Sequence, residues 1–471
     1  MPRPKAECLR ITNLRALCVL CGGQVRAVSE ALPVHANSAI NRSGHEFLAS
    51  VKTLNSPPPT LVPAFENQDE LFSSAFSILK DAISAQAFPA ASIAVTQGDR
   101  LIALKSLGHF TYGDPKGTPP FSRTPREGGD FDLAVPPATL FDLASVTKTV
   151  ATTTMAMILY ERGLLELESP VIGVVPEFLA DSCGEPDARR RDVTFRMLLA
   201  HGSGLPAYEK LFLKKHSRND LLRAAFTTSL STNPGSHAEY SDIGFIVLGA
   251  ALERIAGETL DAFCQREIFG PLGMTNTTFN PPKESRAKIP PTADERAESE
   301  CGAGAPARAK PEAKSVPGAS ETPRSTFRKK IIQGEVQDEN ASVLGGVAGH
   351  AGLFSTAEDL ARFAYTILHG HPILRPETVS LFTRRESAPP GTSRALGWDT
   401  PSAPSQSGSH FGPRSFGHLG YTGTSLWIDP DRHLSITLLT NRTWPDCANQ
   451  AIRQVRPKFH DAVVEALNRT T

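Results

Sequence analysis

Two segments with β-strand patterns lie near opposite ends of this chain of 471 residues and constrain its fold. Residues 91–104 carry two apolar runs around a turn at Gly98 and Asp99, which predicts a hairpin. Residues 424–429 and 434–440 flank a second turn at 430–432 and predict another. Helical patterns fill the chain between them. We therefore expect an α/β fold whose central antiparallel sheet is formed from both chain ends and flanked by helices.

The helical patterns are recognised by apolar residues that repeat every three to four positions. Residues 69–86 predict an amphipathic helix. Much later in the chain, Thr194 is the expected N-cap of the short helix that begins directly after Thr194. Ser355 and Glu358 have the spacing of a capping box. Further helices are expected at 150–163, 242–253, 260–269 and 447–468, the last packing on the sheet.

The ends and one internal stretch differ from this pattern. Residues 1–60 are interpreted as a tail that ends in the Pro-rich linker 56–60, and residues 61–471 as the folded domain. Residues 297–325 have almost no large apolar side chains, so we expect a disordered insertion there. The first residues are basic, but the apolar run 16–21 is shorter than a usual signal-peptide core. The leader is therefore poor, and both an extracytoplasmic and a cytoplasmic location stay open.

Composition excludes several classes of protein. Lys+Arg and Asp+Glu both number 49, which gives no reason to expect a nucleic-acid partner. No apolar run reaches the roughly 18–20 residues of a transmembrane helix. The seven cysteines are scattered and predict no disulfide framework, and the lone Cys18/Cys21 pair is interpreted as incidental. Nothing in the sequence predicts the oligomeric state.

The pattern Ser-x-x-Lys occurs three times, and its context separates the three copies. Ser77/Lys80 lies inside a predicted surface helix, and Ser285/Lys288 lies in a polar stretch flanked by proline. Only Ser145/Lys148 stands at the start of a helix that continues with apolar residues. Residues three apart on a helix share one face, and a Ser hydroxyl becomes a nucleophile when a base lies beside it. We expect Ser145 to be the nucleophile and Lys148 its proton acceptor.

Two later segments could complete a catalytic site. Tyr240 could pass a proton to a leaving group if the ammonium of Lys148 lowers its pKa, and Asp242 could hold Lys148 or a substrate amide. The backbone N–H of Tyr421 could form an oxyanion hole with that of Ser145.

In the same second segment, Gly420 would let substrate approach the strand, and His418 would supply a donor or a positive charge. Tyr112/Asp114 has the same spacing as Tyr240/Asp242 but is the weaker candidate for that role. His350 begins a second match to the pattern of His418 and Gly420, and we expect it in a loop near the rim of the site. Residues 421–423 are a second-ranked alternative to residues 418–420.

This ordered set resembles the serine β-lactamase and penicillin-binding-protein superfamily, in its class C-like branch of esterases and D-alanyl-D-alanine peptidases. The family's S-x-x-K matches residues 145–148, its Y-x-N matches 240–242 and its K/H-T-G matches 418–420. The resemblance extends over about residues 65–467 except the insertion. Other stretches that look like the family are 198–206, 271–274, 351–360 and 420–430.

The resemblance implies a catalytic domain with a mostly helical subdomain, acting through an acyl-enzyme without a metal or cofactor. It implies a small-molecule or peptidoglycan-type substrate and an extracytoplasmic site. Two departures matter: Asp242 replaces the usual Asn and favours a charged Lys148, and Leu419 replaces the usual Thr that binds a substrate carboxylate. The second departure favours ester-type substrates over β-lactams and D-Ala-D-Ala peptides. The alternative is a sensor or cell-wall-binding module that binds without turnover.

Overall fold

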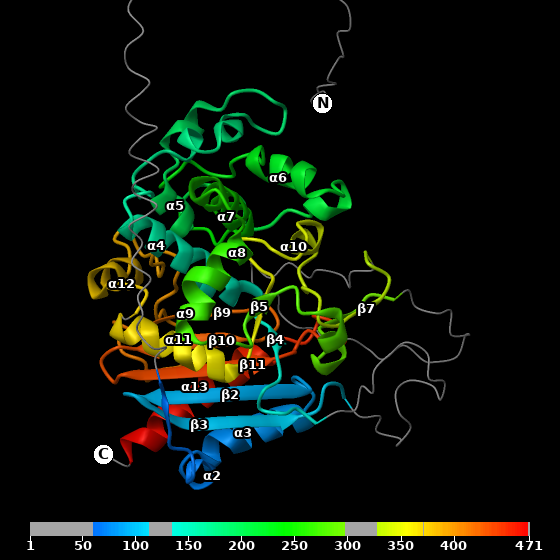
Figure 1. Cartoon of the computed structure of the whole chain (residues 1–471), viewed down its shortest axis with the longest axis vertical. Helices are drawn as coiled ribbons and strands as arrows, with labels where there is room; N and C mark the ends of the chain where they lie inside the picture. Colours follow the sequence, from blue (N-terminus) through cyan, green and yellow to red (C-terminus); the bar gives the residue numbers. More distant parts are fainter. Residues whose placement is uncertain (1–59, 113–133, 297–326, 371, 470–471) are drawn as a thin grey trace, which may run out of the picture. The chain divides into compact units, whose positions relative to one another are not determined.

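A six-stranded sheet pairs strands from the two ends of the chain in the computed structural model (Figure 1). The structure describes residues 60–112, 134–296, 327–370 and 372–469. The N-terminal strand β2 (Ala90–Gln97) pairs antiparallel with the C-terminal strand β11 (Leu434–Thr440), with Ile93 opposite Leu438. The order is β1-β3-β2-β11-β10-β9, with β1 (Val62–Pro63), β3 (Arg100–Gly108), β9 (Phe416–Leu419) and β10 (Ser425–Asp429). The predicted α/β architecture is confirmed.

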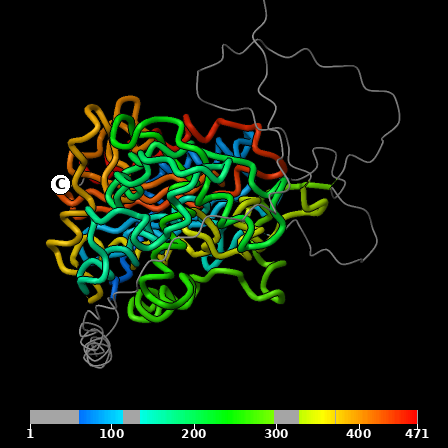
Figure 2. Tube along the Cα trace, turned by 90° about the horizontal axis from the view of Figure 1, so that it is seen from above, coloured from blue at the N-terminus to red at the C-terminus, as the bar shows by residue number. Residues whose placement is uncertain are grey.

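Both faces of this sheet are covered, because successive side chains of a strand point to opposite sides. In β10, Leu426 joins the core that contains α11 (Ala357–His369), whereas Trp427 joins the core formed with α3 (Ser73–Ser84) and α13 (Ile452–Asn468). In the perpendicular view of Figure 2, the blue N-terminal segments again lie beside the orange and red C-terminal ones. The sheet is therefore a buried central layer.

Beyond the α11 face lies the mostly helical part of the chain, shown in green and teal in Figure 1. A three-stranded sheet of order β4-β8-β5 connects this part to the segment that carries Ser145. The remaining strands form a two-stranded pair, β6–β7. The bounds are β4 (Phe141–Asp142), β5 (Thr278–Phe279), β6 (Ala293–Asp294), β7 (Ile331–Ile332), β8 (Leu353–Ser355), α2 (Gln68–Leu71), α4 (Thr154–Glu161), α5 (Phe195–Leu199), α6 (Arg218–Phe226), α7 (Asp242–Ala256), α8 (Leu260–Cys264), α9 (Gly270–Leu272), α10 (Glu339–Val343) and α12 (Pro376–Thr383).

Several element boundaries differ from the prediction. The helix expected at 69–86 is divided at Phe72 into α2 and α3, and the last helix begins at Ile452 rather than at residue 447. Thr356, not Ser355, caps α11, because Ser355 is the last residue of β8 and its hydroxyl bonds Thr277. The sheet is antiparallel except at its edge, where β1 runs parallel to β3.

Some predictions fall on residues that the structure does not describe. The tail at 1–59, the Cys18/Cys21 pair and the insertion at 297–325 lie outside the described residues, so the proposed division into tail and domain stays a prediction. Within the described part of the chain, none of the helices combines the length and the apolar character that crossing a bilayer requires.

Candidate active site

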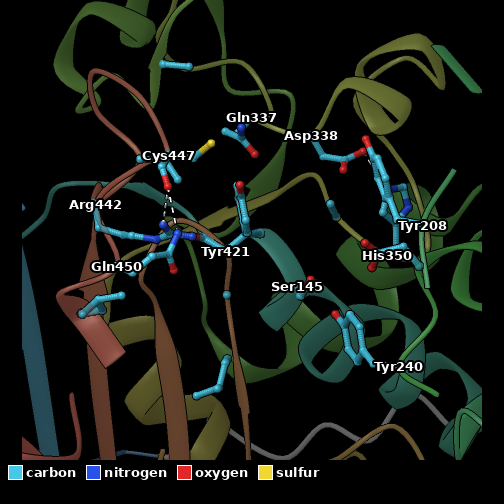
Figure 3. Close-up of a pocket in the computed structure, with 18 of the residues that line it drawn as sticks. Ser145, Tyr208, Tyr240, Gln337, Asp338, His350, Tyr421, Arg442, Cys447 and Gln450 are labelled. Atoms are coloured by element: carbon cyan, nitrogen blue, oxygen red, sulfur yellow. Dashed lines mark hydrogen bonds and ion pairs between the residues drawn. The ribbon is translucent and has the colours of Figure 1, made fainter. Parts of the chain in front are cut away.

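The backbone immediately before Ser145 turns sharply. β4 ends at Asp142, and the next turn, Ala144–Val146, is a 3₁₀ turn that continues through the π-helical residues Lys148–Thr153 into α4. Ala144 has φ +46°, a left-handed conformation that costs energy for a residue with a Cβ. The turn places the Ser145 hydroxyl on the wall of a cavity of about 570 Å³ (Figure 3).

Lys148 is fully buried and holds three acceptors at once. Its Nζ donates to Ser145 Oγ at 2.9 Å, to Asp242 Oδ1 at 2.7 Å and to the backbone oxygen of His350 at 3.0 Å. Burial is the largest single effect and lowers the pKa of Lys148, but the charges and hydrogen bonds of Asp242 and Tyr240 together outweigh it, so the net pKa is raised. The resting group is therefore an ammonium with all three N–H donors engaged.

Tyr240 lies beside this ammonium and also contacts Ser145. Its ring centroid is 4.9 Å from Lys148 Nζ and 4.7 Å from the ring centroid of His201. Burial raises the pKa of Tyr240, and so does the charge of Asp242. The charge of Lys148 and the hydrogen bonds with Lys148 and Ser145 lower the pKa without reversing this rise. Lys148 lowers the phenol pKa as expected, but desolvation is the larger contribution, so the net pKa of Tyr240 lies above its ordinary value.

The backbone around Tyr240 is fixed by polar contacts. Ser241 caps α7, its Oγ accepting from the N–H of Gly244 at 2.9 Å, and its own N–H donates to His201 Nδ1 at 3.0 Å. Asp242 is thus the first residue of a buried helix whose cap is anchored on both sides. This anchoring places the Asp242 carboxylate against Lys148.

His418 is neutral in this site. Its Nδ1 lies 2.8 Å from the carbonyl oxygen of Leu419, which can only accept, so Nδ1 carries the proton. Burial lowers the pKa of His418 to about 3, and the nearby Lys148 contributes to this lowering. The expectation of a positive charge at this position is therefore wrong. Nε2 is a buried acceptor without a partner among the described residues.

The turn after β9 is tied to the segment before Ser145 by two buried hydroxyls. Thr422 Oγ1 donates to the backbone oxygen of Asp142 at 2.7 Å, and Thr424 Oγ1 donates to that of Leu143 at 2.9 Å. A Cβ on Gly420 would lie 2.4 Å from the Leu143 oxygen. The contact with the Leu143 backbone thus requires glycine at position 420. Gly420 also lines the cavity, and its role in the approach of a substrate stays a prediction. The shifted register fails because Thr422 is turned away from the cavity.

Tyr421 projects from this turn into the cavity with 43% of its surface exposed. The guanidinium of Arg442 lies 4.6 Å from its ring centroid, and Arg442 Nε donates to its backbone oxygen at 2.7 Å. The N–H of Tyr421 has no acceptor among the described residues, and Ser145 is in the first turn of its helix, where an N–H has no intrahelical acceptor. Both amides are thus available to a ligand.

The sequence profile of the family described as Beta-lactamase matches residues 75–457. The chain belongs to the β-lactamase family. It is 31% identical over 320 residues to a protein of Escherichia coli (strain K12) provisionally named D-alanyl-D-alanine carboxypeptidase, which covers 64% of this chain and 69% of that protein. An N-acetylmuramyl-L-alanine amidase of Bacillus subtilis (strain 168) is 30% identical over 320 residues, 64% of this chain and 68% of the amidase.

Among solved structures, one described as EstCE1, a hydrolase with promiscuous acyltransferase activity, superposes with a TM-score of 0.61 at 22% identity. The match covers 84% of this chain and 99% of EstCE1, and at this identity it shows the fold. The resemblance read from the motifs is confirmed, and the protein is a hydrolase of the β-lactamase family.

This β-lactamase-family site has features that the sequence does not indicate: the buried position of His350, and the residues Asp338 and Tyr208. His350 was expected on the rim, but it is buried: its carbonyl oxygen accepts from Lys148, and its Nε2 is 2.8 Å from Asp338 Oδ1. Tyr208 lines the wall opposite Tyr421 in Figure 3. The motif at 350–352 indicates His350, and no motif in the sequence indicates Asp338 or Tyr208.

Proposed function

We propose that Ser145 attacks the carbonyl of an ester or amide and forms an acyl-enzyme, which water then hydrolyses. The observation that carries the proposal is the 2.9 Å contact between Ser145 Oγ and Lys148 Nζ on the wall of a cavity that also exposes two free amides. A nucleophile, an adjacent proton acceptor and an oxyanion site are the three requirements of acyl transfer.

The proton acceptor in this proposal is the Lys148–Tyr240 pair after it has lost one proton. Two such close groups titrate together, so the loss belongs to the pair rather than to one residue. The pair takes the Ser145 proton as Oγ bonds to the carbonyl carbon, and it returns that proton to the leaving nitrogen or oxygen. A water then attacks the acyl carbon, gives its proton to the pair, and Ser145 leaves with that proton.

For the substrate we propose a peptidoglycan-type amide or a small ester. The names of the two bacterial relatives, D-alanyl-D-alanine carboxypeptidase and N-acetylmuramyl-L-alanine amidase, support the amide. Leu419 supports the ester, since it offers no hydroxyl to a substrate carboxylate where the family motif has one. An extracytoplasmic location follows if the substrate is peptidoglycan.

The test is covalent labelling of Ser145. Incubation with a p-nitrophenyl ester or a penicillin should add one acyl group, detected by mass spectrometry and located by peptide mapping. Ser145→Ala should abolish the adduct and reduce turnover to background. Ser77→Ala is the matched control, because Ser77 also precedes a lysine by three residues but lies exposed on α3. Labelling and turnover that survive in Ser145→Ala would refute the proposal.

A binder without turnover is the second candidate, and the engaged ammonium of Lys148 favours it. A proton acceptor without a free lone pair would slow deacylation more than acyl binding. Stopped-flow release of p-nitrophenol separates the two candidates. A burst followed by steady turnover supports the hydrolase, and a single stoichiometric burst supports the binder. D-Ala-D-Ala peptides, muramyl peptides and a chromogenic cephalosporin then identify the substrate.

A further inference from the structure

Asp142 is a buried carboxylate that none of the motifs includes, and it contacts three parts of the site at once. Its Oδ1 accepts from the N–H of Ala144 at 2.8 Å and its Oδ2 from the N–H of Gln337 at 2.6 Å. Its backbone oxygen accepts from Thr422 Oγ1 at 2.7 Å. The three partners belong to the nucleophile turn, the segment before α10, and the turn that presents Tyr421.

The first contact stabilises the strained residue. Ala144 adopts φ +46°, which an alanine holds only when its surroundings compensate the cost. Its N–H donates to the carboxylate of Asp142, which closes the turn that aims Ser145 at the cavity. Without this acceptor, the turn would lose a charge-assisted hydrogen bond at the one residue whose conformation is unfavourable.

The other two contacts fix the distance across the cavity. Gln337 precedes Asp338, whose carboxylate binds His350, and the backbone oxygen of His350 binds Lys148. On the opposite side, Thr422 follows Tyr421, whose N–H has no acceptor among the described residues. Asp142 is therefore linked to the oxyanion turn by one hydrogen bond and to Lys148 through the contacts of Gln337, Asp338 and His350.

We propose that Asp142 is a positioning residue that must be ionised for Ser145 to react, and this rests on the proposed acyl transfer at Ser145. A carboxylate can accept with both oxygens, whereas a protonated carboxyl has a hydroxyl that donates and cannot hold a second N–H equally well. Protonation therefore releases one of the two amides, either that of Ala144 or that of Gln337.

The titration of this group falls in an accessible range. The pKa of Asp142 is raised to about 6, mainly because the group is buried. The nearby charge of Asp338 also raises the pKa, whereas the hydrogen bonds from the two amides and the charge of Arg328 lower it. Asp338 is itself paired with His350, and Arg328 with Glu295. The ionised form is thus the main one above pH 6, and the enzyme loses the positioning as pH falls through this value.

The effect on stability has the opposite sign. A carboxyl whose pKa is raised in the folded state stabilises the fold below its unfolded pKa of about 4, and this contribution is lost as pH rises through about 6. Protonation of Asp142 therefore does not unfold the protein. A loss of activity between pH 7 and pH 5 that comes from Asp142 would appear without a loss of thermal stability from the same group.

The experiment compares Asp142→Asn with wild type across pH 5–8.5 in p-nitrophenyl ester hydrolysis. The introduced side chain has one acceptor oxygen and an NH₂ group that cannot accept, so it resembles the protonated carboxyl. The ratio of wild-type to variant kcat should be about tenfold at pH 8, as a lost charge-assisted bond predicts, and should approach one at pH 5. A ratio that is the same at every pH would overturn the proposal.

Two further variants keep the test decisive if Asp142→Asn folds poorly. Thr422→Val removes the hydroxyl bond to Asp142 and should lower kcat while KM and the inflection near pH 6 stay; Thr422→Ser should restore kcat. Asp359→Asn is the matched control, because Asp359 is a buried carboxylate that accepts from the N–H of Asn276 away from the cavity. Its ratio to wild type should not vary with pH.

The outcome also separates this inference from the proposed function. If Ser145→Ala retains the acyl adduct, the proposed function fails whatever Asp142→Asn does. If Ser145→Ala loses the adduct but the Asp142→Asn ratio is constant with pH, or Thr422→Val matches wild type, only the positioning role fails.

Discussion

Replacing Asp242 by Asn should make this enzyme faster at neutral pH. Asp242 is the residue where the chain departs from the family motif, and its carboxylate lies 2.7 Å from Lys148 Nζ. The variant removes the negative charge but keeps an oxygen that can accept from the ammonium. Because the charge of this carboxylate is the largest of the contributions that raise the pKa of Lys148, its removal should lower that pKa and increase the fraction of the Lys148–Tyr240 pair that is ready to accept a proton.

The size of the effect follows from the contact. An opposite charge this close shifts a pKa by about 1–3 units, so at pH 7 the reactive fraction should increase about 10- to 1,000-fold. A base of lower pKa accepts a proton less readily, which reduces the net gain in kcat/KM to about 3- to 30-fold. The gain should disappear at high pH, where the wild-type pair has also lost its proton.

The assay is the pH dependence of kcat/KM with a p-nitrophenyl ester from pH 6 to 10. Because the pKa of Lys148 is raised above its ordinary value, the wild-type rate should still be rising at pH 10. In Asp242→Asn the inflection should lie about 1–3 units lower, so the rate of the variant should level off within this range. Asp81→Asn, which removes an exposed carboxylate on α3, should leave the inflection in place. Asp242→Ala should also move the inflection of the pH profile to lower pH. It should lower kcat/KM, because this variant removes the oxygen that accepts the hydrogen bond from Lys148 Nζ. An Asp242→Asn variant that is slower at every pH with an unmoved inflection would refute this account of the site.

Two other substitutions test the oxyanion turn and the substrate. Gly420→Ala would place a Cβ 1.9 Å from Thr424 Oγ1, so the turn must shift. The kcat should fall more than tenfold, and the free energy of unfolding in urea should decrease by about 1–3 kcal/mol. A variant with wild-type kcat would contradict this account of the packing. Leu419→Thr should lower KM for a D-Ala-D-Ala peptide about tenfold, because a hydrogen bond to a charged group contributes about 1.5–3 kcal/mol, while KM for a neutral ester should not change.

The nucleophile was predictable because its chemistry is local. Ser145 and Lys148 are three residues apart at the start of a helix, so their contact needs only the helical backbone. Tyr240 and Asp242 were predictable as a segment, because the helix that follows them has a strong apolar pattern. The sheet was predictable for the same reason, because each of its long strands has a strand pattern in its own sequence. The two predicted hairpins lie near opposite ends of the chain, so one sheet that includes both was the simplest arrangement.

What the sequence did not indicate depends on backbone atoms and on burial. The third acceptor of Lys148 is the carbonyl oxygen of His350, and a carbonyl has no residue type by which to recognise it. The neutral state of His418 follows from its complete enclosure, which a motif does not reveal. Ser355 and Thr356 are equally good caps in sequence, and only the pairing of β8 decides between them.

The titrating groups of the site together predict an unusual pH profile. Asp142 must be ionised and the Lys148–Tyr240 pair must lose a proton, so both requirements increase the rate as pH rises. His418 cannot add a falling limb, because its pKa of about 3 leaves it neutral throughout. The slope of log kcat/KM against pH should therefore exceed one between about pH 5 and pH 6 and approach one above this range, with a plateau and no maximum. Asp142→Asn should remove only the lower bend and Asp242→Asn should move only the upper one. A bell-shaped profile would show that a third group, which must stay protonated, takes part in the reaction.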